Sequence, residues 1–185
     1  RPSPVRSSPV ARDGYRRLNH PGLAEQLRPY LKGPASAWLV RRVAIQIAAA
    51  CRLSSLEGDL LRIALDEADF YPTRIQAAQA VAEIGGEQFR ARLLPLAVGE
   101  AGDDPDDELK GYALRALWPG LITAEDFFRS LTPPRREHFF GAYRLFLEGE
   151  DRLNLRPSDL PSGLRWVAHP KEDPHHEYSF HRLVG

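Results

Sequence analysis

Apolar residues recur at the spacing of amphipathic helices, and the pattern repeats every 33 residues. The positions that coincide under this shift are Leu23, Leu56 and Phe89; Leu27, Leu60 and Leu93; and Tyr30, Ile63 and Leu96. Within each segment they are spaced i, i+4 and i+7, which places them on one face of a helix. Each repeat is therefore predicted to open with an amphipathic helix.

A second helix is predicted to follow the first in each repeat. The aligned positions are Arg41 with Arg74, Ala44 with Ala77, Ile47 with Ala80, and Cys51 with Ile84. After three extra residues the third repeat continues the pattern with Lys110, Ala113, Ala116 and Leu117. No strand-like alternation competes with it. The sequence predicts an all-α fold, a right-handed α-solenoid of about three to four helix pairs.

The predicted repeat domain covers 15–148, with units at about 20–52, 53–86, 87–120 and 121–148. The fourth pair is less regular, and its helices are expected at 123–131 and 134–148. Residues 1–14 are rich in Pro, Ser and Arg, and are predicted to be a disordered linker. Residues 149–185 are predicted to be an irregular segment rich in Pro and His, with one short helix near 159–167.

Proline and glycine mark the expected helix ends. Pro21, Pro105 and Pro133 follow residues that favour helix starts, and Asp104 is the expected cap before Pro105. Glycines fall where helices should stop: Gly33, Gly85, Gly99 and Gly120. Pro29 and Pro95 occupy equivalent positions inside first helices, so both helices should be kinked.

The second helices, VRRVAIQIAAA and TRIQAAQAVAEIG, resemble those of the HEAT repeat family, in which a basic residue opens a helix rich in small residues. Ankyrin and tetratricopeptide patterns do not fit. Three further strings, LNHPGLAEQLRPYL, DDPDDELKGYALRALWP and LTPPRREHFFGAY, resemble the helical-repeat sensor region of bacterial NACHT-type signal-transducing NTPases. This resemblance implies flanking effector and NTPase domains, although the sequence contains no G-x-x-x-x-G-K-[ST] motif.

Charge and cysteine content narrow the function. The 25 basic residues equal the 25 acidic ones, which argues against steering of the whole domain to DNA or anionic lipid. The single cysteine forms no internal disulfide, and no apolar run reaches the length of a membrane span. We therefore expect a cytoplasmic protein that does not bind membranes. With no methionine in the chain, residue 1 is not expected to be a native start.

Arg41, Arg74 and Lys110 recur once per repeat and are expected to stack as a ladder along one edge. They could form a basic groove, or they could pair with acids in neighbouring turns such as Asp69 and Asp104. The zero net charge favours pairing. Three aromatic residues at the starts of second helices, Trp38, Tyr71 and Tyr112, could stack on a ligand, but packing between repeats is favoured. These six residues are the candidate partner-binding positions.

Other clusters favour structural roles. The acidic run Glu100–Glu108 lacks the spacing of a calcium loop and is interpreted as a solvated loop with a helix cap. The late histidines are interpreted as a polar tail rather than a metal site: His169, His175, His176 and His181. Cys51 is expected in the core. The sequence predicts no catalytic, cofactor-binding or metal site.

These observations favour a non-catalytic interaction module that binds a protein or peptide on its concave face. The alternative is a HEAT-like DNA glycosylase or another nucleic-acid-binding solenoid. Trp38, Trp118 and Trp166 suit such an enzyme by residue type only, and no motif supports it. A relative of the phycobilin lyases is a weaker third hypothesis. A strongly basic concave face would favour the glycosylase, whereas a neutral or apolar face would favour the interaction module.

Overall fold

The computed structural model describes residues 9–136, 138–148 and 155–168 of the chain. Every regular element in these ranges is helical and none is a strand, which confirms the all-α prediction. The chain divides into two compact units, Arg1–Leu93 and Leu94–Gly185. The boundary falls inside the third predicted repeat, 87–120.

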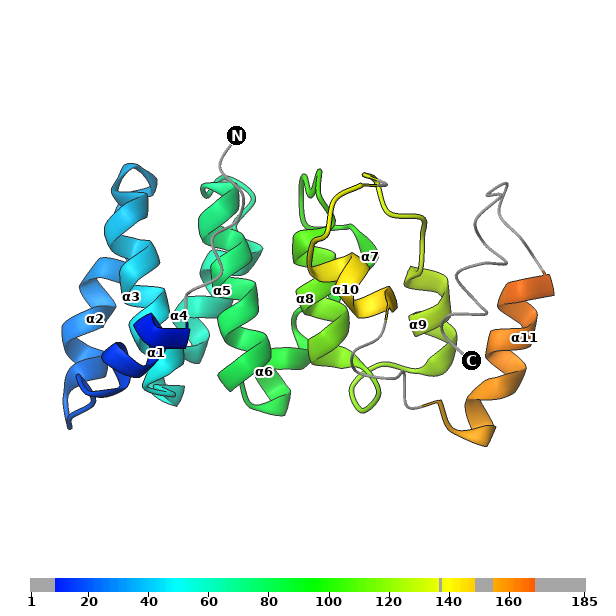
Figure 1. Cartoon of the computed structure of the whole chain (residues 1–185), viewed down its shortest axis with the longest axis horizontal. Helices are drawn as coiled ribbons and strands as arrows, with labels where there is room; N and C mark the ends of the chain where they lie inside the picture. The colour runs from blue at the N-terminus through cyan, green and yellow to red at the C-terminus, as the bar shows by residue number, and fades with distance from the viewer. Residues whose placement is uncertain (1–8, 137, 149–154, 169–185) are drawn as a thin grey trace. The chain divides into compact units, whose positions relative to one another are not determined.

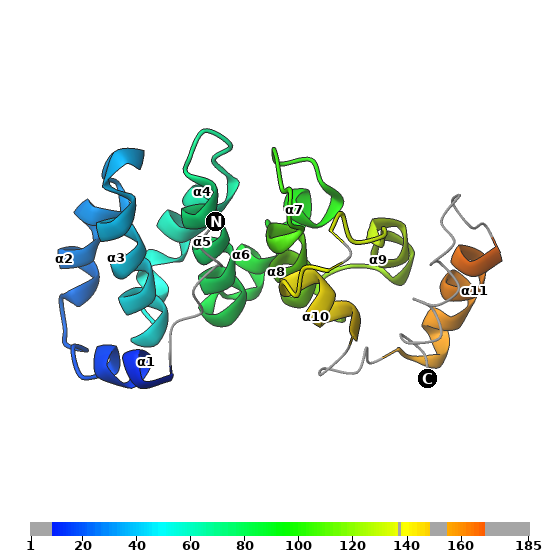
Figure 2. The same cartoon turned by 45° about the horizontal axis from the view of Figure 1, so that its top comes forward.

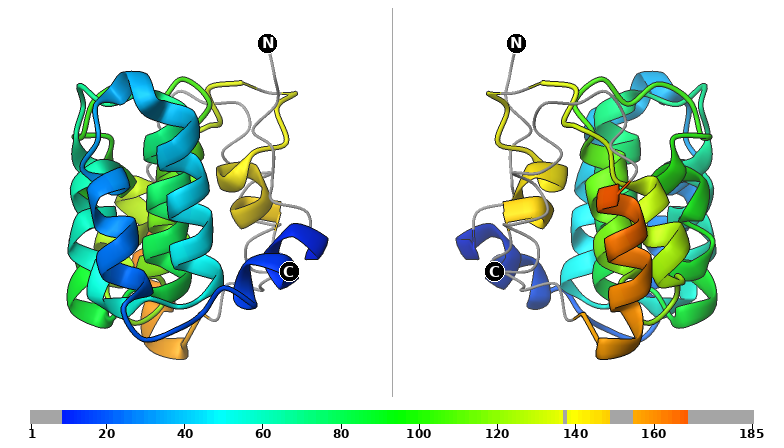
Figure 3. Two further views of the ribbon diagram at one scale, coloured as in Figure 1. Left: turned by 90° about the vertical axis from the view of Figure 1, so that its left-hand side faces the viewer. Right: turned by 90° about the vertical axis from the view of Figure 1, so that its right-hand side faces the viewer.

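The described part of the first unit is built from short α-helices: α1 (Pro9–Arg16), α2 (Leu23–Leu31), α3 (Trp38–Ala50), α4 (Glu57–Leu65), α5 (Tyr71–Ile84) and α6 (Glu87–Ala91). Helix α2 packs on α3 and α4 on α5, while α3 also contacts α5 and α2 contacts α4 (Figure 1). Two helix pairs thus follow one another, with α2 and α4 in one layer and α3 and α5 in the other (Figures 2 and 3). The pairs coincide with the predicted units 20–52 and 53–86.

Most positions of the predicted apolar stripes form the core of this unit. Leu27 and Leu60, which are aligned in the repeat, are both buried, and so is Ile63. The prediction is wrong for Tyr30, which is aligned with Ile63 but is 52% exposed. Helix α3 packs on α5, and both helices bury small residues: Ala44 of α3 is 3% exposed and Ala77 of α5 is 0% exposed. Their short side chains allow the two second-layer helices to approach closely.

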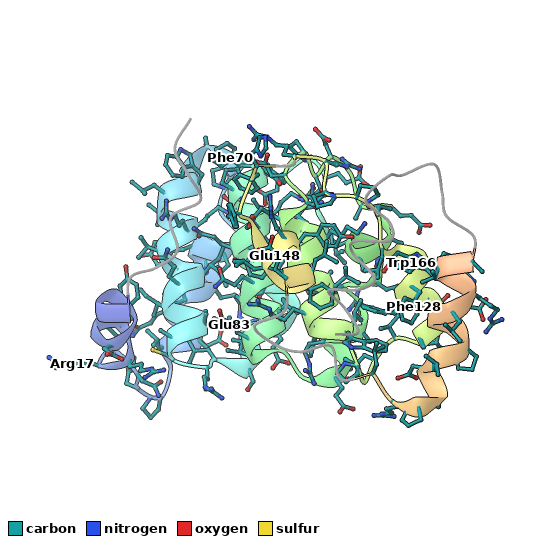
Figure 4. The ribbon with its side chains drawn as sticks, turned by 45° about the vertical axis from the view of Figure 1, so that its right-hand side comes forward. Arg17, Phe70, Glu83, Phe128, Glu148 and Trp166 are labelled. Carbon is teal, nitrogen blue, oxygen red and sulfur yellow. The ribbon has the colours of Figure 1, made fainter. Side chains whose placement is uncertain are left out.

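The second unit contains five α-helices in its described ranges: α7 (Leu94–Val98), α8 (Glu108–Leu117), α9 (Ala124–Ser130), α10 (Ala142–Glu148) and α11 (Leu160–Ala168). Helix α8 contacts α7 and α10, and α11 packs on α9. The rings of Phe128 and Trp166 meet at that last contact, 5.8 Å apart (Figure 4). Phe127 is fully buried, and its ring stacks on that of Trp118 at 4.1 Å.

The predicted helix ends agree with the structure at all four glycines. Helices α2, α5, α7 and α8 each end within three residues of Gly33, Gly85, Gly99 or Gly120. Gly99 has a φ of 78°, a left-handed conformation that favours glycine. The short helix expected near 159–167 is also present as α11.

The prediction of an irregular linker over 1–14 is wrong for its last residues, because α1 begins at Pro9. Proline is well suited to the first position of a helix. Helix α1 packs against α3, so a tertiary contact stabilises a segment that was predicted to be irregular. Residues 1–8 lie outside the described residues.

The predicted kink at Pro95 is a break rather than a bend. Helix α6 ends at Ala91 and α7 starts at Leu94, which places Pro95 in the first turn of a new helix. A proline in the first turn removes no intrahelical hydrogen bond. Pro29 lies inside α2, as predicted.

The predicted helix over 134–148 is shortened to α10, and no helix starts at Pro133. Thr132 does not precede a helix start. Its backbone N–H donates to the Tyr143 hydroxyl at 2.9 Å, and its carbonyl accepts from that hydroxyl at 2.6 Å. The residues before α10 are therefore held by side chains rather than by helical hydrogen bonds. Of the segment 149–185, residues 149–154 and 169–185 lie outside the described residues.

The close contact of α3 with α5 predicts the effect of a large side chain at Ala77. We expect Ala77→Phe to destabilise the protein by about 1–3 kcal/mol or more, because the core has no room for the ring. Thermal unfolding measures the effect, and Ala91→Phe at an exposed position of α6 is the control. An unchanged melting temperature for Ala77→Phe would show that this contact is not close.

Candidate functional site

Arg41 is part of a buried ion pair in the first unit. Its Nη1 donates to Asp69 Oδ1 at 2.7 Å, and its Nη2 donates to Asp69 Oδ2. The side chains are 3% and 4% exposed, so the pair lies away from solvent. Asp69 Oδ1 also accepts the N–H of Phe70, the residue that precedes α5. This confirms the predicted pairing for Arg41, and the pair fixes the start of α5 against α3.

Arg74 lies inside the same unit, only 2% exposed. Its Nε donates to the carbonyl of Ala64 at 3.2 Å, near the end of α4. The guanidinium therefore ties α5 to the carbonyl end of α4, where a positive charge is favourable.

Lys110 is 7% exposed and belongs to the second unit. Its Nζ donates to Thr132 Oγ1 at 2.6 Å and lies 4.6 Å from the centre of the Tyr143 ring. Burial raises the pKa of Tyr143, so its hydroxyl stays protonated and can donate to Thr132. The lysine contacts the segment before α10 and α10 itself.

The three aromatic candidates lie in different surroundings. Tyr112 is 6% exposed inside the second unit, and Tyr71 is half-buried at the start of α5. Trp38 is 41% exposed, and its ring packs on that of Phe70 at 5.6 Å. Phe70 is itself exposed at the end of the α4–α5 turn (Figure 4). A partner can therefore reach Trp38 and Tyr71, but not Tyr112.

Burial also removes the three cations from the accessible surface. Arg41, Arg74 and Lys110 are each less than a tenth exposed. A basic groove made of these side chains is therefore not present in the structure. Other side chains therefore form the accessible surface of α3 and α5.

Helix α3 carries a cluster of exposed apolar side chains, which we call the α3 face. Its members are Trp38 (41% exposed), Leu39 (57%), Val40 (50%), Val43 (37%) and the adjoining Phe70 (44%). Successive helical residues are about 100° apart, so Val43 lies between Leu39 and Val40 around the helix. Neighbouring exposed apolar residues of this kind are typical of a surface that another molecule covers. The sequence analysis did not single out Leu39, Val40 or Val43, although these apolar residues follow one another closely at the start of the second helix.

The acidic run Glu100–Glu108 is largely built into the fold. The Asp104 carboxylate binds the start of α8, since it accepts the N–H groups of Leu109 at 3.3 Å and Lys110 at 2.9 Å. The predicted helix start at Pro105 is wrong, because α8 begins at Glu108. The interpretation of the rest as a solvated loop is wrong for two acids, Asp107 and Glu108, which are 4% and 3% exposed.

Asp107 and Glu108 each bind a backbone N–H of the segment that follows α9. Asp107 Oδ2 accepts from Arg135 at 2.7 Å, and Glu108 Oε1 accepts from Ala142 at 2.9 Å. At the rim, Arg136 pairs with Asp106 at 2.6 Å. The run is thus an anchor for the segment before α10. No pattern within the run reveals this, because the donors lie about 30 residues away.

Two sets of candidate residues remain, Cys51 and the four late histidines. Cys51 is half-buried rather than fully in the core, and its thiol donates to the Tyr15 carbonyl at 3.2 Å. Burial raises the pKa of this thiol, so it is held in the unreactive protonated form. The four late histidines lie outside the described residues. Within the described ranges, no group of three or more His, Cys, Asp and Glu side chains is arranged to hold a metal ion.

Comparisons with protein-family models, with curated proteins and with solved structures give no match for this chain. None of the helices in the described ranges is both long enough and apolar enough to cross a membrane.

The buried Arg41–Asp69 pair predicts a large stability loss when one partner is removed. We expect Arg41→Met to cost about 3–5 kcal/mol, because it leaves the Asp69 carboxylate buried without its partner. Adding Asp69→Leu should recover part of the loss, since no buried charge then remains. The control is Arg129→Ala in an exposed pair with Glu125, which should cost about 0–1 kcal/mol. Equal losses for Arg41→Met and Arg129→Ala in urea unfolding would contradict a buried pair.

Asp107 predicts a pH dependence of stability. Burial raises the pKa of its carboxyl, although Arg135 and Lys110 oppose the shift. The folded protein therefore takes up this proton at a higher pH than the unfolded chain. The resulting stabilisation is present below the folded pKa and is lost as the pH rises through it.

Carboxyl NMR should show Asp107 titrating above the ordinary range of aspartate. As the pH falls from neutral, wild type should gain stability relative to Asp107→Asn. A titration midpoint at or below the ordinary value would contradict the burial of this carboxylate.

Proposed function

We propose that this chain is a non-catalytic interaction module that binds a protein or peptide through the α3 face. The observation that carries the proposal is the exposure of Leu39, Val40 and Val43 on one side of a helix that is otherwise packed. Apolar area of this kind is stabilised by burial against a partner, at roughly 25 cal/mol per Å². Trp38 and Phe70 add large aromatic rings at the edge, and aromatic residues are enriched at protein interfaces.

The wider architecture in this proposal is a right-handed solenoid of HEAT-like helix pairs. The 33-residue spacing supports it, together with the successive pairs α2–α3 and α4–α5 in the first unit. In such stacks the second helices line the binding surface, which is the layer that carries the α3 face. The resemblance to the sensor regions of bacterial NACHT-type NTPases extends the proposal to a role in recognition within a larger signalling or defence protein.

Electrostatics supports a protein partner over nucleic acid. Affinity for duplex DNA depends on accessible Lys and Arg that neutralise phosphates. Arg41 is paired with Asp69, and Arg74 is bound to the Ala64 carbonyl, so these guanidinium groups are already engaged inside the fold. The face that remains accessible on α3 is mainly apolar.

Site-specific photo-crosslinking tests the proposal. A benzoylphenylalanine at Val43 should crosslink a defined protein in cells that express the full reading frame, whereas one at exposed Glu67 should not. Val43→Asp should then reduce affinity for that protein by roughly tenfold or more, because it places a charge in the apolar contact. Its melting temperature should stay close to wild type, since Val43 is exposed.

The opposite outcome would be a nucleic-acid activity. Micromolar binding of duplex DNA at about 50 mM salt that weakens roughly 10³- to 10⁵-fold by about 200 mM would indicate six to ten phosphate contacts. If Val43 crosslinks gave no protein and this binding persisted after removal of residues 1–17, the interaction proposal would be overturned in favour of a nucleic-acid-binding solenoid.

A further inference from the structure

Helix α3 is covered along only part of its length within the first unit. Helix α1 packs against it, and the Cys51 thiol, just past the end of α3, donates to the Tyr15 carbonyl of α1 at 3.2 Å. Ile47, in the later part of α3, is half-buried, whereas Leu39 and Val43 are exposed. Helix α1 therefore lies outside the two layers of the first unit, toward the end of α3 and beyond the α3 face (Figure 3).

The second unit shows the same kind of packing. Helix α10 lies on α8, and every residue of α8 except Arg115 is buried. A Cβ on Gly111 would overlap the backbone at Ala142 and Tyr143, so the two helices are in close contact. In each unit, a short helix thus packs on the second helix of a predicted repeat. On α3 the covered part stops short of the α3 face.

The α3 face has the row pattern of a helix–helix contact. Leu39, Val43 and Ile47 are four residues apart and form one row along α3, and Val40 lies three residues before Val43. Such rows are the ridges and grooves into which the side chains of a second helix pack. Every regular element in the described ranges is helical, so this part of the chain offers no sheet edge to which an extended peptide could add a strand. The surface therefore suits a helix.

The α3 face is small for a stable contact between two folded chains. Its five side chains are each about half exposed. Since a large aromatic side chain covers roughly 150–250 Å², the face offers at most on the order of 500 Å². A stable interface usually buries about 800 Å² on each partner. An area of this order suits a short segment better than a second copy of the chain.

We propose that the α3 face binds one amphipathic helix of a partner protein, which continues along α3 the outer layer that α1 begins. This assignment rests on the proposed interaction function and adds the class of partner. The partner helix carries apolar residues at positions i, i+3 or i+4, and i+7, so that one stripe meets Leu39 and Val43. Trp38 and Phe70, whose rings pack together at 5.6 Å, flank this contact at the start of α3.

Peptide selection with the full chain as bait tests the class of partner. The probe is a phage library of random peptides of about 16 residues, enough for four helical turns. Selected peptides should share an apolar stripe of helical spacing. Val43→Asp should reduce their affinity roughly tenfold or more, because it places a charge in the apolar contact. Leu164→Asp is the matched control, since Leu164 is 53% exposed on α11, and it should leave the affinity unchanged.

Proline substitution in the selected peptides separates a bound helix from a bound extended segment. A proline on the polar side, in the middle of the peptide, should weaken binding roughly tenfold or more, because it breaks a helix. Peptides that require Val43 but tolerate this proline would overturn the helix and leave the α3 face as the interaction site. Failure to select any peptide that depends on Val43 would overturn both the helix and the α3 face.

Sedimentation tests whether a second copy of the chain occupies the α3 face. Wild type and Val43→Asp should sediment with the same mass, because the face is small for a dimer. A dimer that Val43→Asp dissociates would assign the face to a second copy and would overturn the inference.

Discussion

The first N–H groups of a helix have no partner within the helix, and this constraint organises both units. Several starts are satisfied by carboxylates that are themselves buried. Asp69 accepts the N–H of Phe70 before α5, and Glu57 accepts the N–H of Gly86 before α6. Asp104 caps α8, and Glu108 binds the first N–H of α10. Because these helices are only five to fourteen residues long, they depend on such contacts and on packing to form.

The buried carboxylates determine the positions of the basic side chains. A buried charge is costly unless it is paired and hydrogen-bonded. Arg41 therefore lies against Asp69, and Lys110 lies near Asp107, where its charge opposes the rise in that carboxyl pKa. Cations committed in this way cannot attract phosphates, and the accessible face of α3 is left to apolar side chains.

The sequence predicted those parts of the structure that depend on local periodicity. The Leu27 and Leu60 stripes and the glycine stops gave two helix pairs of the first unit, and the repeat spacing placed Arg41 near Asp69. The sites were harder to predict. The alignment placed Arg74 and Lys110 on an edge, whereas only the packed helices show that both are enclosed. Covering of α8 depends on Gly111 and on carboxylates that bind residues some 30 positions away, and no local pattern encodes such a contact.

Helices α3 and α8 differ in how far their own units cover them. In the second unit, a seven-residue helix and the chain before it cover α8, at the cost of burying Glu108 and Lys110. In the first unit, α3 keeps Leu39, Val40 and Val43 in solvent, although α1 already packs against another part of the same helix. Burying these three side chains would be favourable, whereas burying the polar start of α8 is not. The exposed apolar face of α3 is accounted for if another molecule completes it.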